Sequence, residues 1–72
     1  MFNEYKIRVQ KDRYSNFEDI YICIVDTNEE LRNKEIKKQY EKKVKDLEEK
    51  YYKVFFQMNL LDENKNFIST VF

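Results

Sequence analysis

The sequence predicts an α+β domain with the element order β-β-α-β-β, in which a four-stranded, mostly antiparallel sheet carries one long amphipathic helix on one face. The first observation is a helical period in residues 27–50, where apolar residues return every turn from Ile36 onward. The second is that the segments on both sides are short and rich in β-branched and aromatic residues, which favour strands. A length of 72 residues predicts one domain, 1–72.

The helix is expected to begin at Thr27, because Thr27 and Glu30 have the spacing of a capping box. Its end is less clearly marked, since neither Gly nor Pro follows it. The apolar period continues as far as Leu61, which leaves a longer helix as an alternative. Residues 51–56 are nevertheless dense in aromatic side chains and favour a strand, so the predicted helix ends at Lys50.

The first two strands are predicted from alternation. Residues 2–10 place Tyr5, Ile7 and Val9 on one face and polar residues on the other, as in a half-buried strand. Residues 19–26 are apolar on both faces. A strand of that kind is expected at the centre of a sheet or covered on both faces.

The third and fourth strands are predicted to form a second hairpin. Residues 51–61 supply the third strand, and residues 67–72, which carry no charge, supply the fourth. An uncharged strand at a sheet edge favours association. Between them, residues 62–66 form the hairpin loop, where Asn64 or Asn66 is expected to adopt the left-handed conformation.

Composition bounds the class of protein. Fourteen basic and fourteen acidic residues balance, which argues against both a strongly basic nucleic-acid binder and an acidic DNA mimic. Cys23 is the single cysteine, so there is no disulfide framework, as expected in a reducing compartment. No signal peptide is visible, and the longest apolar run, 20–25, is too short to span a bilayer. We therefore expect a soluble, cytoplasmic protein.

The residues needed for catalysis are scarce. The chain has no histidine, which excludes imidazole-based catalysis and imidazole metal ligands, and no glycine for a phosphate-binding loop. Cys23 lies in an apolar strand and is interpreted as a core residue. Adjacent carboxylates all lie at the ends of predicted elements, where caps and solvated surface explain them. We expect no enzyme, no cofactor and no metal.

The aromatic residues predict an interaction surface. One helix cannot cover all the apolar side chains of four strands, so a protein partner, and first of all a second copy, is expected to bury the remainder. The predicted partner-binding residues are Tyr51, Phe55, Phe72 and Tyr21. The alternative is that the loop 11–18 folds over this surface, with Tyr14 and Phe17 as the cover.

The helix also carries a basic stripe. Between Arg32 and Lys45 there are seven basic residues and two acidic ones. Helical spacing aligns four of them on the solvent side: Lys34, Lys38, Lys42 and Lys45. Such a stripe contacts an acidic protein partner or nucleic-acid phosphates, or it simply solvates the helix.

The function predicted from these observations is a small, non-enzymatic protein-binding module that forms a homodimer. Its richness in residues with AT-rich codons suggests a phage or plasmid accessory protein that inhibits a host enzyme or defence nuclease by steric occlusion. One alternative is a nucleic-acid-binding protein that uses the basic stripe. Another is a structural subunit that associates through an edge strand.

Overall fold

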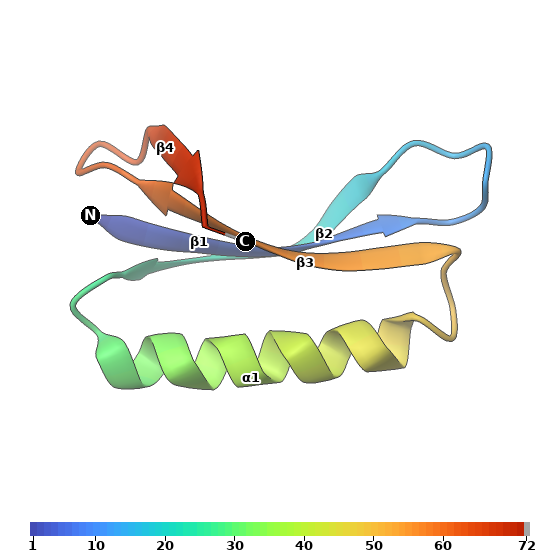
Figure 1. Cartoon of the computed structure of the whole chain (residues 1–72), viewed down its shortest axis with the longest axis horizontal. Coiled ribbons are helices and arrows are strands. Elements are labelled where there is room, and N and C mark those ends of the chain that lie inside the picture. The colour runs from blue at the N-terminus through green and yellow to red at the C-terminus, as the bar shows by residue number, and fades with distance from the viewer. Residues whose placement is uncertain (72) are drawn as a thin grey trace.

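The computed structural model describes residues 1–71 and confirms the predicted order β-β-α-β-β (Figure 1). The elements are β1 (Phe2–Gln10), β2 (Glu18–Asp26), α1 (Glu30–Leu47), β3 (Lys53–Leu61) and β4 (Phe67–Thr70). The strands form one antiparallel sheet in the order β2-β1-β3-β4, with α1 along one face. The continued helix over residues 51–58 is wrong: α1 ends at Leu47, three residues before the predicted end at Lys50, and β3 confirms the strand from Lys53 onward. In the described part of the chain, no helix combines the length and apolar character that crossing a membrane requires.

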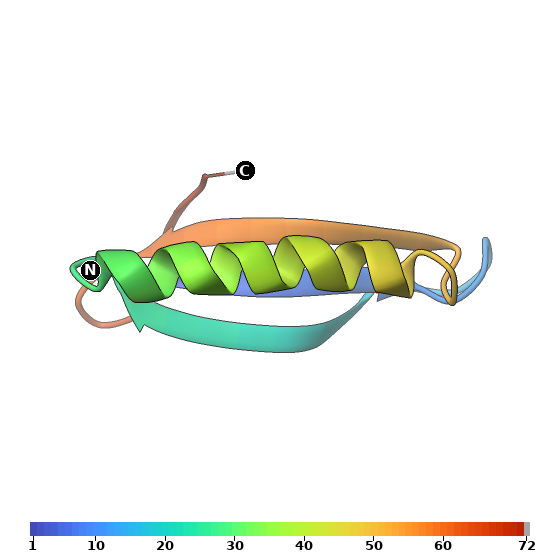
Figure 2. The same ribbon diagram turned by 90° about the horizontal axis from the view of Figure 1, so that it is seen from below.

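The core lies between α1 and the central strands. On β1 the alternating residues Tyr5, Ile7 and Val9 are buried, as the sequence predicts. Ile36 and Tyr40 of α1 pack against them, and the Tyr40 ring meets the Tyr5 ring edge-on at 6.3 Å. Seen from the helix side, α1 runs over β1 and β3, while β2 lies to one side (Figure 2). One helix therefore covers the middle of the sheet and leaves its edges less protected.

The predicted capping box is wrong. α1 begins at Glu30 rather than Thr27, and no side chain caps its first backbone N–H groups. The Thr27 hydroxyl instead donates to the Met1 carbonyl at the end of the sheet. The helix start is held by Asn33, whose Nδ2 donates to the carbonyls of Asp26 and Glu29 at 2.9 and 2.7 Å. This contact depends on the tertiary position of the preceding strand, which local spacing does not reveal.

The β3–β4 turn also differs from its prediction. Lys65, with φ of 64°, takes the left-handed conformation that was expected at Asn64 or Asn66. Those two residues have another role, because their backbone N–H groups donate to Asp62 Oδ1 at 2.8 and 2.9 Å. These hydrogen bonds lower the pKa of the Asp62 carboxyl. An aspartate at the start of the turn thus replaces the missing glycine as its organising residue.

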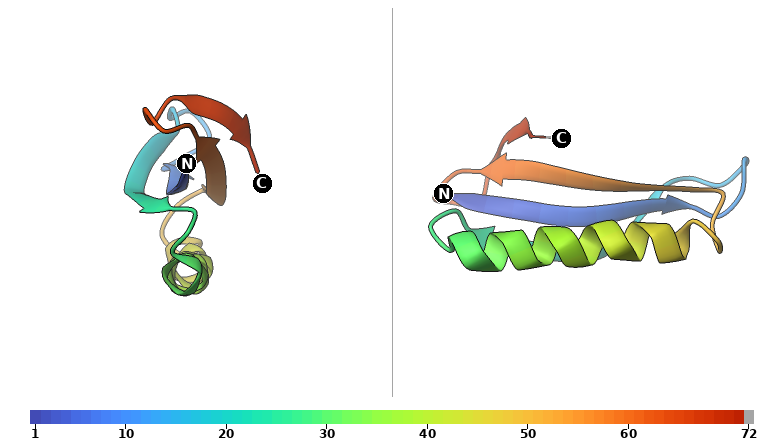
Figure 3. Two further views of the ribbon diagram at one scale, coloured as in Figure 1. Left: turned by 90° about the vertical axis from the view of Figure 1, so that its left-hand side faces the viewer. Right: turned by 60° about the horizontal axis from the view of Figure 1, so that its bottom comes forward.

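The expected central or doubly covered position of the second strand is wrong. β2 is an edge strand that pairs only with β1, and a bulge interrupts the register at Ile7/Arg8. At the other edge, β4 is short and pairs with β3 only from Asn59 to Leu61. β4 also rises on the side of the sheet away from α1 (Figure 3). The longest exposed edge of this sheet is therefore that of β2, and among the described residues the outer side of β3 lacks a paired strand over residues 53–57.

Two tyrosines buried in the core make the stability of the protein depend on pH in the alkaline range. Desolvation raises the pKa of the Tyr5 and Tyr40 phenols above the ordinary value of 10.0. Because the folded state favours the neutral phenol, this contribution to stability is complete below pH 10.0 and is lost as pH rises through the folded-state pKa values. We expect a spectrophotometric titration to show two tyrosines ionising late. Tyr5→Phe should remove one of these late transitions, and ionisation of Tyr5 and Tyr40 at the ordinary value of 10.0 in the folded protein would contradict this expectation.

Candidate protein-interaction surfaces

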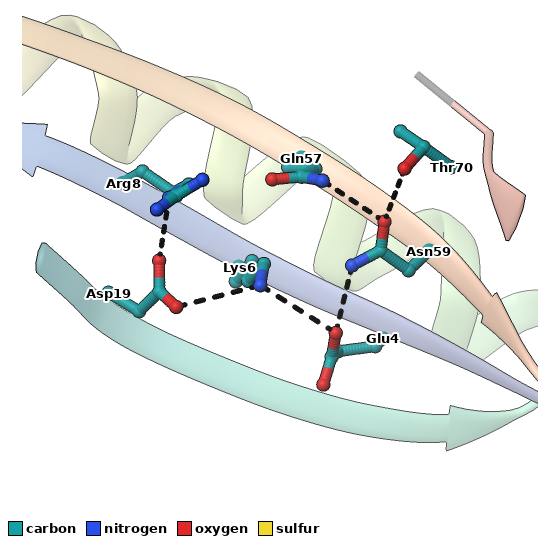
Figure 4. A network of polar contacts seen from close by, with 7 residues as sticks. All are labelled: Glu4, Lys6, Arg8, Asp19, Gln57, Asn59 and Thr70. Carbon is teal, nitrogen blue, oxygen red and sulfur yellow. Dashed lines mark hydrogen bonds and ion pairs between the residues drawn. The ribbon is translucent and has the colours of Figure 1, made fainter. Parts of the chain in front are cut away.

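The face of the sheet opposite α1, here called the open face, is polar at its centre (Figure 4). Lys6 Nζ lies 4.0 Å from Glu4 and 3.5 Å from Asp19, and Arg8 Nε lies 3.0 Å from Asp19 without hydrogen-bond alignment. Two cations thus balance two carboxylates. The buried Asn59 donates to Glu4 at 2.9 Å. The apolar excess expected on the sheet is therefore confined to the margins of this face.

One such margin is an aromatic pair. Phe17, from the loop between β1 and β2, stacks on Phe55 of β3 with ring centroids 5.0 Å apart. The Arg8 guanidinium lies 5.9 Å from the Phe17 ring. Tyr14, by contrast, is 89% exposed and covers nothing. The alternative in which the loop shields the sheet is thus half right: Phe17 covers Phe55, which remains 46% exposed, and Tyr14 does not contribute.

The aromatic residues predicted to bind a partner do not form one patch. Phe55 opposes Arg8 and Tyr21 opposes Ile7, so they lie on opposite faces of the sheet. Tyr21 contacts the Tyr40 ring edge-on and carries the Lys43 ammonium 4.2 Å from its centroid. Tyr51 is half-buried against the core, and Phe72 lies outside the described residues. A partner-binding role for these four residues stays a prediction.

The β2 edge, the outer side of Glu18–Asp26, is the second margin of the open face. Its middle residues, 20–25, carry no charge. Ile22 and Ile24 point to the open face, with exposed fractions of 58% and 40%. Natural proteins usually protect an edge of this length with charges, bulges or a covering loop. Here the bulge and the carboxylates lie towards the ends and leave the apolar middle open.

The lysine stripe, here called the lysine flank (Lys34, Lys38, Lys42 and Lys45), is exposed along its whole length. Three of its members line a groove between α1 and β3. The groove is lined by Lys38, Lys42 and Lys45, by Glu41 and Glu48, and by Val44 and Phe56. Lys43, in contrast, lies over Tyr21. The flank is thus more than a solvated face, because it borders half-buried apolar side chains.

The charges of the lysine flank are available to a ligand. Within residues 1–71, no ion pair joins any of its four lysines to a carboxylate. Glu41 and Glu48 on the walls of the groove reduce its positive charge but do not cancel it. An acidic group that binds in the groove would therefore contact ammonium groups without first breaking an ion pair within the protein.

Ile22 and Ile24 are the surface residues that sequence reasoning missed. Their apolar character was visible, but it was assigned to coverage inside the sheet. The signal that could have indicated an edge strand is the short apolar run of Glu18–Asp26 with carboxylates at both ends, although the same run also fits a central strand.

The described residues contain no group of three or more His, Cys, Asp or Glu side chains suitable for a metal ion. The candidate surfaces are thus three: the polar open face of the sheet, the apolar β2 edge and the basic lysine flank. A comparison with known proteins gave no match to a family model, a curated protein or a solved structure.

Proposed function

We propose that this chain is a non-enzymatic protein-binding module that takes an acidic segment of a partner protein along its lysine flank. The observation that supports this is the groove between α1 and β3, which three lysines and two glutamates line together with the apolar side chains of Val44 and Phe56. A ligand with carboxylates and one apolar side chain matches both properties. The module acts sterically, by occupying the surface of the partner that carries this segment.

The two components of the groove contribute differently. Exposed lysines attract an acidic partner over a Debye length of about 8–10 Å and raise the rate of association, at a cost in salt sensitivity. Each exposed charge pair adds only about 0.2–1 kcal/mol to affinity. Residence on the surface therefore depends on an apolar side chain that reaches Val44 and Phe56. Inhibition of an enzyme or nuclease would follow if the acidic segment borders that partner's active site.

Nucleic-acid binding is the second candidate, and the observation that favours it is the length of the lysine flank. Lys34 lies outside the groove and extends the row of ammonium groups by one helical turn. Phosphates need such a row but make no use of an apolar floor. The two candidates are therefore separated by Val44: its replacement weakens protein binding and leaves phosphate binding unchanged.

The test uses a triple variant, Lys38→Glu/Lys42→Glu/Lys45→Glu, with Lys11→Glu/Lys50→Glu/Lys53→Glu as a control of equal charge outside the groove. The probes are a peptide of alternating glutamate and leucine and a DNA duplex, each titrated by NMR at low and raised salt. We expect the peptide to shift the Val44 and Phe56 signals. The groove variant should weaken binding about 10- to 100-fold, from three reversed charges, and the control much less.

Two results would overturn the proposal. Equal loss of peptide binding in both triple variants would mean that the peptide responds to net charge rather than to the groove. DNA binding that exceeds peptide binding and survives Val44→Ser would favour the second candidate instead.

A further inference from the structure

We propose that β2 pairs antiparallel with β2 of a second copy, about a two-fold axis at Cys23, so that two four-stranded sheets join into one continuous sheet. The pairing does not involve the lysine flank, which lies on the other side of α1 from β2. It is therefore independent of the proposed function. Four properties of the β2 edge favour a second copy as the strand that pairs with it: main-chain direction, register, charge and the space beside α1.

The main chain of β2 is ready for a further strand. Residues of an antiparallel strand bond alternately to one side and the other. The Thr27 N–H donates to Met1, so the residues of the same parity, including Cys23, bond to β1. The N–H and C=O groups of Ile22 and Ile24 consequently point outward from the β2 edge. An added antiparallel strand would satisfy these groups over the uncharged middle of β2.

Charge selects the register. A two-fold axis keeps the two sheet faces continuous only if one residue of β2 lies directly opposite its own copy. The candidates for this residue are Ile22, Cys23 and Ile24, and the axis is named after it. An axis at Ile22 would place Asp26 opposite the partner's Glu18 twice, which is a repulsive arrangement.

An axis at Ile24 would place Ile22 opposite the partner's Asp26 and bury a carboxylate against an apolar side chain. An axis at Cys23 opposes no two carboxylates, and the residue that it places opposite the partner's Asp26 is Ile20, which lies at the bulge and packs its side chain against the core of its own copy. This axis places Ile22 opposite the partner's Ile24 twice and Tyr21 opposite the partner's Val25. The four exposed isoleucine side chains of two copies then meet on the open face.

Space on the helix side permits this arrangement. Because α1 lies over β1 and β3 rather than over β2, the two helices would be separated by about four strand spacings, or ~19 Å. Packed helices approach to about 8–10 Å, so α1 does not block the partner. β4 lies at the opposite edge of the sheet and rises away from α1 (Figure 3). The formal net charge of zero adds no overall repulsion between two copies.

The first test measures mass by light scattering during gel filtration. We expect twice the 9.0 kDa of one chain, dissociating on dilution. Ile22→Lys/Ile24→Lys should give the single-chain mass, because it places four ammonium groups across the axis. Ile68→Lys, at a side chain 46% exposed on β4, is the matched control and should leave the mass unchanged. Far-UV circular dichroism of both variants confirms that they fold.

The second test reads the register through a disulfide. A directly opposed non-hydrogen-bonded pair has Cα atoms about 4.5 Å apart, within the range of about 4.4–6.8 Å for disulfides. Mild oxidation should therefore link Cys23 to the partner's Cys23, and Cys23→Ser/Ser69→Cys, with its cysteine on β4, should not cross-link. A wild-type monomer at every concentration overturns the dimer and leaves the lysine flank as a binding site. A dimer that persists in Ile22→Lys/Ile24→Lys, or that cross-links only through Ser69→Cys, overturns the β2 interface.

Discussion

Replacing Ile7 by alanine is expected to lower the free energy of unfolding by about 2–5 kcal/mol, because it removes three carbons from the most buried side chain of the core. Ile7 has no exposed surface. It lies at the centre of β1, opposite Tyr21 of β2 and Phe56 of β3. A domain of this size has a total stability near the lower end of about 5–15 kcal/mol. The substitution should therefore unfold much of the protein at 37 °C, as measured by urea denaturation followed by circular dichroism.

Ile68→Ala is the matched control, since Ile68 is 46% exposed on β4. Its expected effect is within about 0.5 kcal/mol. If the two substitutions cost the same, β1 would not form the centre of the core. A loss of less than 1 kcal/mol for Ile7→Ala would have the same meaning, since values below ~2 kcal/mol require a site that collapses around the missing atoms.

The sequence predicted those features of the fold that depend on period alone. Strand β1 was expected at residues 2–10 and spans Phe2–Gln10, because its alternation is regular. The buried stripe of α1 was visible from Ile36 onward, and Ile36 and Tyr40 are its buried residues. Leu31 falls outside that stripe and is 73% exposed. A strict period thus distinguishes core residues from apolar residues that are merely nearby.

The features that depend on neighbours could not be predicted in the same way. Period assigns the residues of β2 to two faces but does not say how many strands flank it, so its edge position was missed. The polar centre of the open face depends on contacts of Lys6 and Arg8 with Asp19 across a bulge. The local sequence pattern does not predict these contacts. For the candidate surfaces, the exposure of the lysine flank was predictable, but the apolar floor beside it was not. Phe56 comes from the next element, β3, and reaches the groove only because that strand folds back along α1.

The proposed dimer and the lysine flank would reinforce one another. Pairing through β2 places both helices on the same face of the joined sheet, with each lysine flank on the outer side, towards β3. A partner that presents two acidic segments, or a two-fold symmetric partner, would then be held at two points. Linked sites of this kind increase avidity by about 10²–10⁴ when the geometry permits simultaneous binding. Ile22→Lys/Ile24→Lys should consequently weaken binding to a bivalent partner while leaving the affinity for a single acidic peptide unchanged.

Asn33→Ala is expected to cost about 2–4 kcal/mol, although Asn33 is only half-buried, because one side chain makes four hydrogen bonds and each is worth about 0.5–1.5 kcal/mol. Its Nδ2 holds the carbonyls before α1, and its Oδ1 accepts from Asn3 at 3.0 Å and from the Tyr5 hydroxyl at 2.7 Å. The residue thus ties the start of the helix to β1. Urea denaturation measures the loss, with the exposed helix residue Gln39→Ala as a control expected to change stability little.

A double-mutant cycle with Tyr5→Phe separates the hydrogen bond between Asn33 and Tyr5 from a general effect of Asn33→Ala on helix propensity. If Asn33 stabilises the protein partly by accepting the Tyr5 hydroxyl, then Asn33→Ala should cost about 1 kcal/mol less in the Tyr5→Phe background than in the wild type. Asn33→Asp keeps the acceptor and loses the two donors, so it should still couple to Tyr5 while freeing the carbonyls of Asp26 and Glu29. Strict additivity of the two substitutions would show that the hydroxyl makes no energetic contact with Asn33. The start of α1 would then depend on the packing of Ile36 and Tyr40 alone.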